Sequence, residues 1–236
     1  MTAAGAQSPA TDRGEWFPLL PGAEVAPASD VVGAFARGQE LVVWRAADGT
    51  PQVWENRCPH RSVRLTLGQV VDNRLSCAYH GWSYAADSAR CERIPAHPDR
   101  TPPANLCART FTCAERDGTV WAWLGADAPA AEPPAHPLPP GWAPLRTLSL
   151  RCSAAMTRLA LAALGWRHEG GALWSGRLGD QPAQALLLEA QSELAMLHLR
   201  CGAAGALRDV HALARQLRAD IESQAGAAAP ATEVSS

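Results

Sequence analysis

The sequence lacks long hydrophobic runs and any strong excess of one charge. No apolar stretch approaches the roughly 18 residues of a membrane-spanning helix, and residues 1–14 lack the apolar core of a signal peptide. The net charge of −2 favours neither nucleic acid nor an anionic membrane as a partner. Lysine is absent, so all 21 basic residues are arginine, a coding bias that carries no structural conclusion. We therefore expect a soluble, cytoplasmic protein with no membrane or nucleic-acid partner.

Two short couples of Cys and His stand out against this background. The first reads CPH at 58–60, and the second reads CAYH at 77–80, after sixteen intervening residues. Such couples can hold a [2Fe-2S] cluster of the Rieske kind, with two thiolates on one iron and two imidazoles on the other. Zinc is the alternative, although zinc fingers tend to pair Cys with Cys and His with His. The spacing predicts four cluster ligands: Cys58, His60, Cys77 and His80.

The residues around both couples extend the motif. Arg61 continues the first as CPHR, Gly81 and Trp82 continue the second as CAYHGW, and an Ile-Pro pair follows at 94–95. Residues from about 16 to 125 thereby resemble the Rieske domain of the ring-hydroxylating and O-demethylating oxygenases, which include vanillate and dicamba demethylases and phthalate oxygenase. The resemblance implies one [2Fe-2S] cluster. It also implies a shell that sets solvent access and hydrogen bonding at the cluster, formed by Arg61, Tyr79, Gly81 and Trp82.

Cysteine usage narrows the type of cluster. Rieske proteins of the cytochrome complexes carry an extra Cys in each loop, joined as a disulfide, whereas those positions here are Val63 and Tyr79. The cluster should therefore have a potential toward the low end of the range of roughly −150 to +300 mV. The five other cysteines have irregular spacing, and we expect buried free thiols at Cys91, Cys107, Cys113, Cys152 and Cys201.

Composition and patterning divide the chain into segments. We expect a disordered N-terminus at 1–13, a mainly β Rieske domain of small antiparallel sheets with two cluster-binding loops at 14–125, and a Pro-rich linker at 126–144. A small α+β domain, which could be a reduced oxygenase catalytic domain, should follow at 145–224, in the order β-α-β-β-β-α. Residues 225–236 should form a disordered tail.

A second iron centre lacks an obvious set of ligands. In the resembled oxygenases the cluster passes electrons to a mononuclear iron held by two His on one helical turn and a carboxylate. Here His168, His198 and His211 lie far apart in sequence. A discontinuous site of His198, His211 and Asp209, or of His168 and Glu169, stays open. A His that is isolated on a strand or helix usually has its hydrogen bonds made by neighbouring protein groups and binds no metal. We therefore do not expect a mononuclear Fe(II).

Three functions follow from these features. The first is a Rieske redox protein, an electron-transfer component or oxygenase-like subunit of a multicomponent oxygenase system. A flavin or ferredoxin reductase would be its electron donor and an oxygenase subunit its acceptor. The second is a compact, self-sufficient oxygenase that hydroxylates or demethylates a small organic substrate. The third is a non-catalytic redox sensor or interaction protein. The sequence favours an oxidoreductase. It identifies neither a catalytic residue nor a substrate, and it is compatible with a homo-oligomer.

Overall fold

The computed structural model describes residues 14–27, 29–202 and 207–228. Its first part contains β1 (Glu15–Pro21), η1 (Gly22–Glu24), β2 (Val31–Ala36), β3 (Gln39–Arg45), β4 (Pro51–Glu55), η2 (Leu65–Leu67), β5 (Gln69–Val71), β6 (Arg74–Ser76), β7 (Ser83–Ala85), β8 (Cys91–Arg93), β9 (Thr110–Phe111), β10 (Cys113–Arg116) and β11 (Thr119–Leu124). Its second part contains β12 (Trp142–Leu150), α1 (Ala154–Ala163), β13 (Arg167–Gly170), β14 (Leu173–Leu178), β15 (Gln181–Gln191), β16 (Leu194–Gly202) and α2 (Leu207–Ala228).

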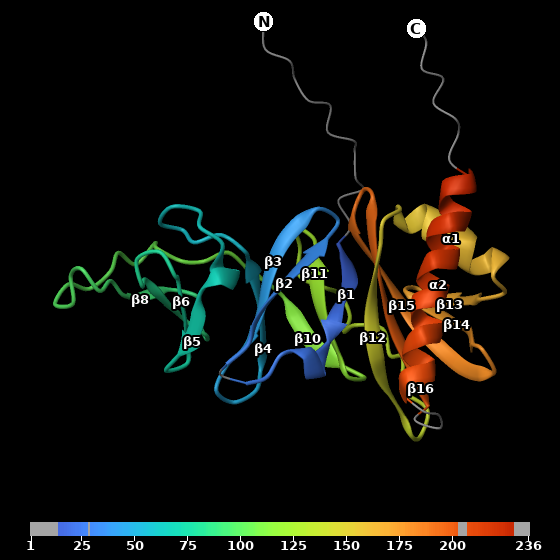
Figure 1. The fold of residues 1–236 in the computed structure, drawn as a ribbon. Helices are drawn as coiled ribbons and strands as arrows, with labels where there is room; N and C mark the ends of the chain where they lie inside the picture. Colours follow the sequence, from blue (N-terminus) through green and yellow to red (C-terminus); the bar gives the residue numbers. More distant parts are fainter. Residues whose placement is uncertain (1–13, 28, 203–206, 229–236) are drawn as a thin grey trace, which may run out of the picture.

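The described strands form four antiparallel sheets arranged in a row (Figure 1). Sheet β5-β6-β7-β8 lies at one end, followed by β2-β3-β4-β9 and by β1-β11-β10. Sheet β12-β16-β15-β14-β13 lies at the other end, where α1 and α2 cover its outer face. The expectation of a mainly β protein with a small α+β part after it is confirmed.

Three tight turns organise the first part. Asp48 and Gly49 connect β3 to β4, which pair in antiparallel register. Asp117 (φ 51°) and Gly118 (φ 70°) connect β10 to β11, since two positive φ angles in succession match the twist of a two-residue hairpin. Residues 72–73, Asp-Asn, do the same between β5 and β6. Asp-Gly and Asp-Asn pairs are typical of such tight turns, because these residues tolerate a positive φ.

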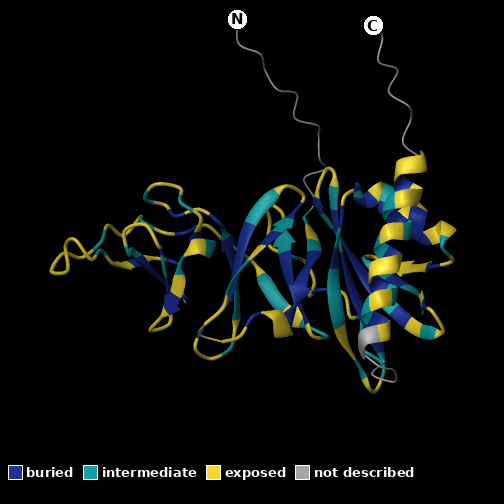
Figure 2. Ribbon diagram, in the orientation of Figure 1, coloured by how far each residue is buried: buried dark blue, intermediate teal, exposed yellow. Residues whose placement is uncertain are grey.

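The C-terminal sheet has two faces with different coverings. On β16, Leu197 and Leu199 face the helices and share a core with Leu161 of α1 and Ala214 of α2. The alternate residues of this strand, such as Met196, face the first part of the chain and pack with its strands β1, β2 and β3. Figure 2 shows the resulting buried layers on both sides of the sheet. The sheet is therefore enclosed by helices on one side and by the first part on the other.

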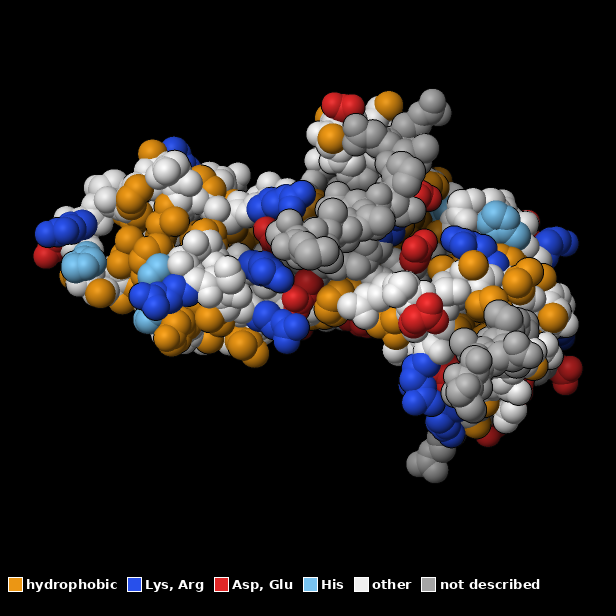
Figure 3. Space-filling model, turned by 90° about the horizontal axis from the view of Figure 1, so that it is seen from above, with side chains coloured by type: hydrophobic (Ala, Val, Ile, Leu, Met, Phe, Trp, Pro, Cys, Tyr) orange, Lys and Arg blue, Asp and Glu red, His pale blue; other side chains and the backbone are white. Residues whose placement is uncertain are grey.

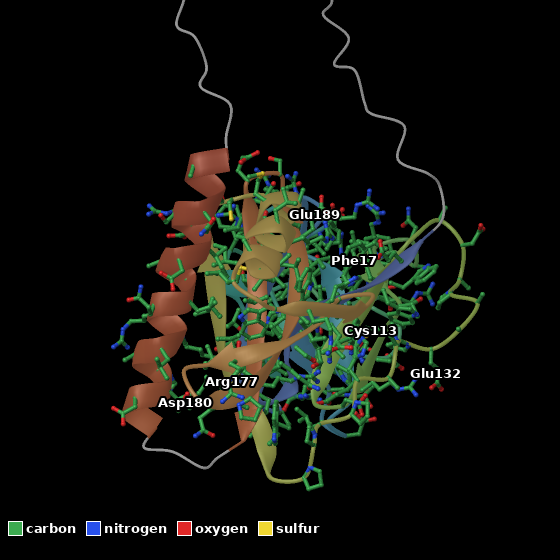
Figure 4. The ribbon with its side chains drawn as sticks, turned by 90° about the vertical axis from the view of Figure 1, so that its right-hand side faces the viewer. Phe17, Cys113, Glu132, Arg177, Asp180 and Glu189 are labelled. Atoms are coloured by element: carbon green, nitrogen blue, oxygen red, sulfur yellow. The ribbon has the colours of Figure 1, made fainter. Side chains whose placement is uncertain are left out.

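Backbone hydrogen bonds fix the seam between the two parts. The amide of Arg37 donates to the carbonyl of Glu189 at 2.8 Å, and the amide of Gly38 donates to that of Ala190 at 2.8 Å. The β2–β3 turn thereby binds β15 at the irregularity between Glu189 and Gln191. Glu189 and Phe17, both labelled in Figure 4, line a cavity of about 300 Å³ at this seam. The two parts are thus joined by specific bonds and not only by the connecting segment.

Several details differ from expectation. Strands β2 and β13 were not foreseen, so the second part has the order β-α-β-β-β-β-α. The run 109–115 divides between two sheets, because β9 pairs with β4 while β10 pairs with β11. Helix α2 continues to Ala228, so residues 225–228 are helical and the expected tail begins too early. Residues 1–13 and 229–236, expected to be disordered, lie outside the described residues. No helix in the described ranges is long and apolar enough to cross a membrane.

Candidate metal centre

The two Cys-His couples lie on two loops with matching backbone bonds. In the first loop the amide of Cys58 donates to the carbonyl of Val63, and the amide of Ser62 donates back to the carbonyl of Cys58, both at 2.8 Å. In the second loop Cys77 bonds the carbonyl of Trp82, and Gly81 bonds the carbonyl of Cys77, both at 2.9 Å. Each loop therefore closes on its own Cys and leaves the His at its tip.

Both loops need a left-handed residue four positions after the Cys. Gly81 has φ +68°, and a Cβ there would stand 3.0 Å from the Cγ of Pro95. Ser62 takes the matching place in the first loop with φ 56°, a conformation that costs a non-glycine residue free energy. The Pro95 ring therefore packs against the turn so closely that a side chain at Gly81 of the CAYHGW motif would crowd it.

The four predicted ligands form a buried pair and an exposed pair. Cys58 and Cys77 are buried and lie beside each other in the core of this subdomain. His80 is exposed and His60 half-buried, and their Nδ1 atoms are 3.2 Å apart. The two thiols therefore lie in the interior, and the two imidazoles lie nearer the surface. The donor types therefore fit a Rieske cluster, which takes thiolates on one iron and imidazoles on the other.

The pairs do not converge on one point. Within residues 14–27, 29–202 and 207–228, no three His, Cys, Asp or Glu side chains surround a common position as ligands of a single ion would. A Rieske cluster distributes its four ligands over two irons. The separation into pairs is thus compatible with that cluster. Burial raises the pKa of the Cys77 thiol, so binding of iron must displace its proton.

Aromatic side chains cover the imidazoles. The Trp82 ring stacks on His60 with 3.9 Å between centroids and an angle of 2° between planes. Tyr79, which is 57% exposed, lies against His80 with centroids 3.8 Å apart. Arg61 is exposed next to His60, whose pKa is lowered by partial desolvation and by the charges of His80 and Arg61. Figure 3 shows hydrophobic, His and Arg side chains gathered on this end of the molecule.

One neighbour of the centre was missed by sequence reasoning. The hydroxyl of Tyr84, fully buried on β7, lies 3.2 Å from the Sγ of Cys58. Burial raises the pKa of Tyr84, and the contact with Cys58 adds to this effect, so the phenol stays protonated. It can donate to a sulfur that has lost its own proton. The available signal was that a buried Tyr usually finds a partner for its hydroxyl.

The remaining cysteines are free, as expected, but not all are buried. Cys91, Cys152 and Cys201 are buried, whereas Cys113 is half-buried and Cys107 is exposed. The expectation of a buried thiol is therefore wrong for Cys107. Its backbone forms an isolated β-bridge with Arg90, and its thiol lies 3.8 Å from the carbonyl oxygen of Ala104.

The candidate ligands of a second iron lie apart. His198 is buried on the face of β16 that meets the first part of the chain, where its Nε2 donates to the carbonyl of Pro18 at 3.0 Å. Asp209 and His211 belong to α2, which packs on the opposite face of the sheet. The site of His198, His211 and Asp209 is therefore not assembled.

The other pair is also engaged elsewhere. The ring of His168, on the exposed edge strand β13, contacts the carbonyl of Gly171 at 2.9 Å and lies near Trp174. Glu169 accepts a hydrogen bond from Arg167, which lowers its pKa. Both side chains act as satisfied surface groups.

Comparison with known proteins agrees with this geometry. Residues 15–112 match the family described as Rieske [2Fe-2S] domain. Oxidoreductase NdmD of Pseudomonas putida is 41% identical over 127 residues, which cover 54% of this chain and 20% of that protein. The 3-chlorobenzoate-3,4-dioxygenase oxygenase subunit of Comamonas testosteroni is 32% identical over 111 residues, which cover 47% and 26%. The chain thus spans about a fifth to a quarter of the length of these relatives.

Likeness in fold extends further than likeness in sequence. The crystal structure of apo dicamba monooxygenase matches with a TM-score of 0.68 at 18% identity, over 90% of this chain and 84% of that one. Such coverage reaches past residue 112 into the C-terminal sheet, and at this identity it concerns the fold alone. The chain therefore carries a Rieske [2Fe-2S] domain related to those of Rieske non-haem iron oxygenases. This domain implies one [2Fe-2S] cluster.

Proposed function

We propose that this chain is a Rieske redox protein that accepts one electron and passes it to another polypeptide. Four residues would hold the cluster: Cys58, His60, Cys77 and His80. When bound, the cluster supplies a one-electron couple. The buried thiols would anchor it, and the imidazoles would carry the electron to the surface.

One observation carries the proposal: His60 and His80 lie on the loops next to sheet β5-β6-β7-β8, which is at the opposite end of the molecule from the C-terminal sheet (Figure 1). An electron that leaves through His80 would enter whatever docks on that end. Tyr79 and Trp82 shape this surface, and the exposed Arg57 and Arg61 add positive charge beside the first loop, whereas Arg64 is paired with Glu40 at 2.6 Å. We infer a flavin or ferredoxin reductase as donor and an oxygenase subunit as acceptor.

A compact oxygenase is the second candidate, favoured by the fold that the chain shares with dicamba monooxygenase. It requires a mononuclear iron. The space between the sheet and the helices is instead occupied by side chains such as Leu161, Trp166 and Trp174, which share one core. We therefore rank electron transfer first.

Iron counting distinguishes the two candidates. The full chain, purified without oxygen, should bind about two irons and about two acid-labile sulfides, because a Rieske cluster accounts for both. Its reduced form should give the rhombic Rieske spin-resonance signal, and no high-spin ferrous centre should bind nitric oxide. A third iron without matching sulfide would establish the oxygenase instead. As a control, His168→Ala should leave the iron content unchanged.

A further inference from the structure

A second cavity lies in the seam between the two parts of the chain. Its volume is about 170 Å³, and it is open at one side. The first part contributes β1, η1 and β2, and the C-terminal sheet contributes the inward face of β12, β15 and β16. It lies on the face of the sheet opposite the helices and is not part of the metal centre.

The wall of this cavity is mainly apolar. Met196 stands among aliphatic side chains such as Leu19 and Leu188. A dry apolar cavity of about 150 Å³ is large enough to bind benzene. The volume here therefore suits one six-membered ring with a short substituent. Met196 adds a thioether, which makes favourable contacts with the edge of an aromatic ring.

Three polar side chains, Glu24, Thr147 and His198, form a chain of contacts at the edge of the cavity. This chain has fewer hydrogen-bond donors than its acceptors can use. The Nε2 of His198 must donate to the carbonyl of Pro18, because a carbonyl only accepts. The Nδ1 of a neutral His198 then needs a donor, and the hydroxyl of Thr147 lies 2.9 Å away. The same hydroxyl lies 3.3 Å from Oε1 of Glu24, another acceptor. One hydroxyl proton cannot serve both.

Thr147 lies closer to the enclosed His198, at 2.9 Å, than to Glu24, at 3.3 Å. Glu24 is exposed at the mouth of the cavity, and its carboxylate can accept further hydrogen bonds from a ligand. Partial burial raises the pKa of Glu24, while its contact with Thr147 opposes this. No Arg lines the cavity, so its one carboxylate has no cation within the wall. The edge is therefore suited to a ligand that brings donors and positive charge.

We propose that this cavity binds a small cationic amine that carries a single apolar ring. The ring would lie between Leu19, Leu188 and Met196, and the ammonium group would donate to Glu24 and to the hydroxyl oxygen of Thr147 or Ser149. A carboxylate ligand would face Glu24 without a compensating charge and should be excluded. The site is independent of the cluster and of the electron-transfer role.

Benzylamine, benzyl alcohol and benzoate test the proposal, because they share the ring and differ in the polar group. The cluster-loaded full chain is titrated with each at neutral pH by calorimetry. Benzylamine should bind, and benzoate should not. Glu24→Gln should weaken benzylamine binding by about tenfold or more, because it removes the charge from the hydrogen bond. Glu193→Gln, an equal charge change on an exposed turn residue, is the matched control and should have no effect.

Methionine-methyl NMR locates the binding site. The chain has three Met, of which Met196 lines the cavity and Met156 packs on the helical core. Benzylamine should shift the Met196 methyl signal, assigned with Met196→Leu, and leave that of Met156 in place. The proposal is overturned if benzylamine does not bind, if benzoate or benzyl alcohol binds equally well, if Glu24→Gln has no effect, or if the Met196 signal does not move. An unchanged visible spectrum confirms that Glu24→Gln keeps the fold.

Discussion

The hydroxyl of Tyr84 lies 3.2 Å from the Sγ of Cys58, inside the core of the cluster-binding subdomain. With Cys58 as a thiolate ligand, this hydroxyl donates to a sulfur of the centre. The hydrogen bond is stronger when the cluster carries the extra electron, so it stabilises the reduced form and raises the potential.

Tyr84→Phe should therefore lower the midpoint potential. A fall on the order of 50 mV corresponds to about 1 kcal/mol of difference between the two redox states for a one-electron couple. Redox titration followed by visible spectroscopy measures it. Tyr79→Phe is the control, since that ring lies against His80 and not against Cys58. Equal potentials in Tyr84→Phe and the native protein would mean that the hydroxyl does not reach the sulfur.

The ligand assignment predicts loss of the cluster from either loop. Cys58→Ser or His80→Ala should abolish the reddish-brown spectrum and destabilise residues 50–95, because metal binding is coupled to folding. Cys91→Ser is the matched control: this thiol is buried in the same core but bonds the carbonyl of Arg93. Visible absorbance and bound iron decide the outcome, and a ligand variant with the full spectrum would remove that residue from the set.

The parts of this fold that follow from sequence are those fixed by local chemistry. Two Cys-His couples, Asp-Gly or Asp-Asn turns and alternating strands specify their own geometry over a few residues. Thus the mainly β first part and most of the order of strands and helices in the second part could be predicted. Strand β13 could not, because its residues RHEG are all exposed and have no apolar alternation.

The relationships between distant segments were also hidden. The neighbours of Cys58 and His198 depend on how sheets stack, which no local pattern encodes. His136, in the segment expected to be a Pro-rich linker, places its carbonyl 3.0 Å from Nη1 of buried Arg200, with its ring near Trp121. Such contacts arise from tertiary packing, and only a three-dimensional structure reveals them.

Arg45 also forms contacts between distant segments, and these contacts lead to a prediction about stability. This buried guanidinium donates to the carbonyls of Gly22, Val25 and Gly49 at 2.8–2.9 Å and to Glu115 at 2.7 Å. Arg45→Met should lower the free energy of unfolding by about 3–5 kcal/mol, because it leaves buried acceptors and a carboxylate unpaired. Urea unfolding followed by Trp fluorescence measures the loss.

The control for Arg45 is an ion pair in solvent. Arg74 bonds Glu92 at 2.6 Å, and both side chains are more than a third exposed. Arg74→Met should cost less than about 1 kcal/mol, since exposed pairs contribute little. Similar losses in the two variants would contradict a special role for the buried Arg45.

His198 predicts how stability depends on pH. Complete burial lowers its pKa from 6.5 to about 4, with Arg200 adding to the shift and the bond to Pro18 opposing it. The unfolded chain binds a proton below pH 6.5 that the folded chain refuses until about pH 4. Stability from this group is thus fully present above pH 6.5 and declines as the pH falls toward 4, by up to about 3 kcal/mol.

His198→Gln isolates that contribution. Glutamine does not titrate, and its amide can still donate to the carbonyl of Pro18, so the variant should lose stability at neutral pH but depend less on pH. The difference in urea midpoint between native protein and variant, measured from pH 7.5 down to pH 4.5, cancels the effects of every other titrating group, the cluster included. That difference should shrink as the pH falls, because the protein with His198 has an unfolded state that protonation of the imidazole stabilises, whereas the Gln variant does not. A constant difference would show that His198 takes up its proton over the same pH range in the folded and unfolded states, so that its burial does not lower its pKa.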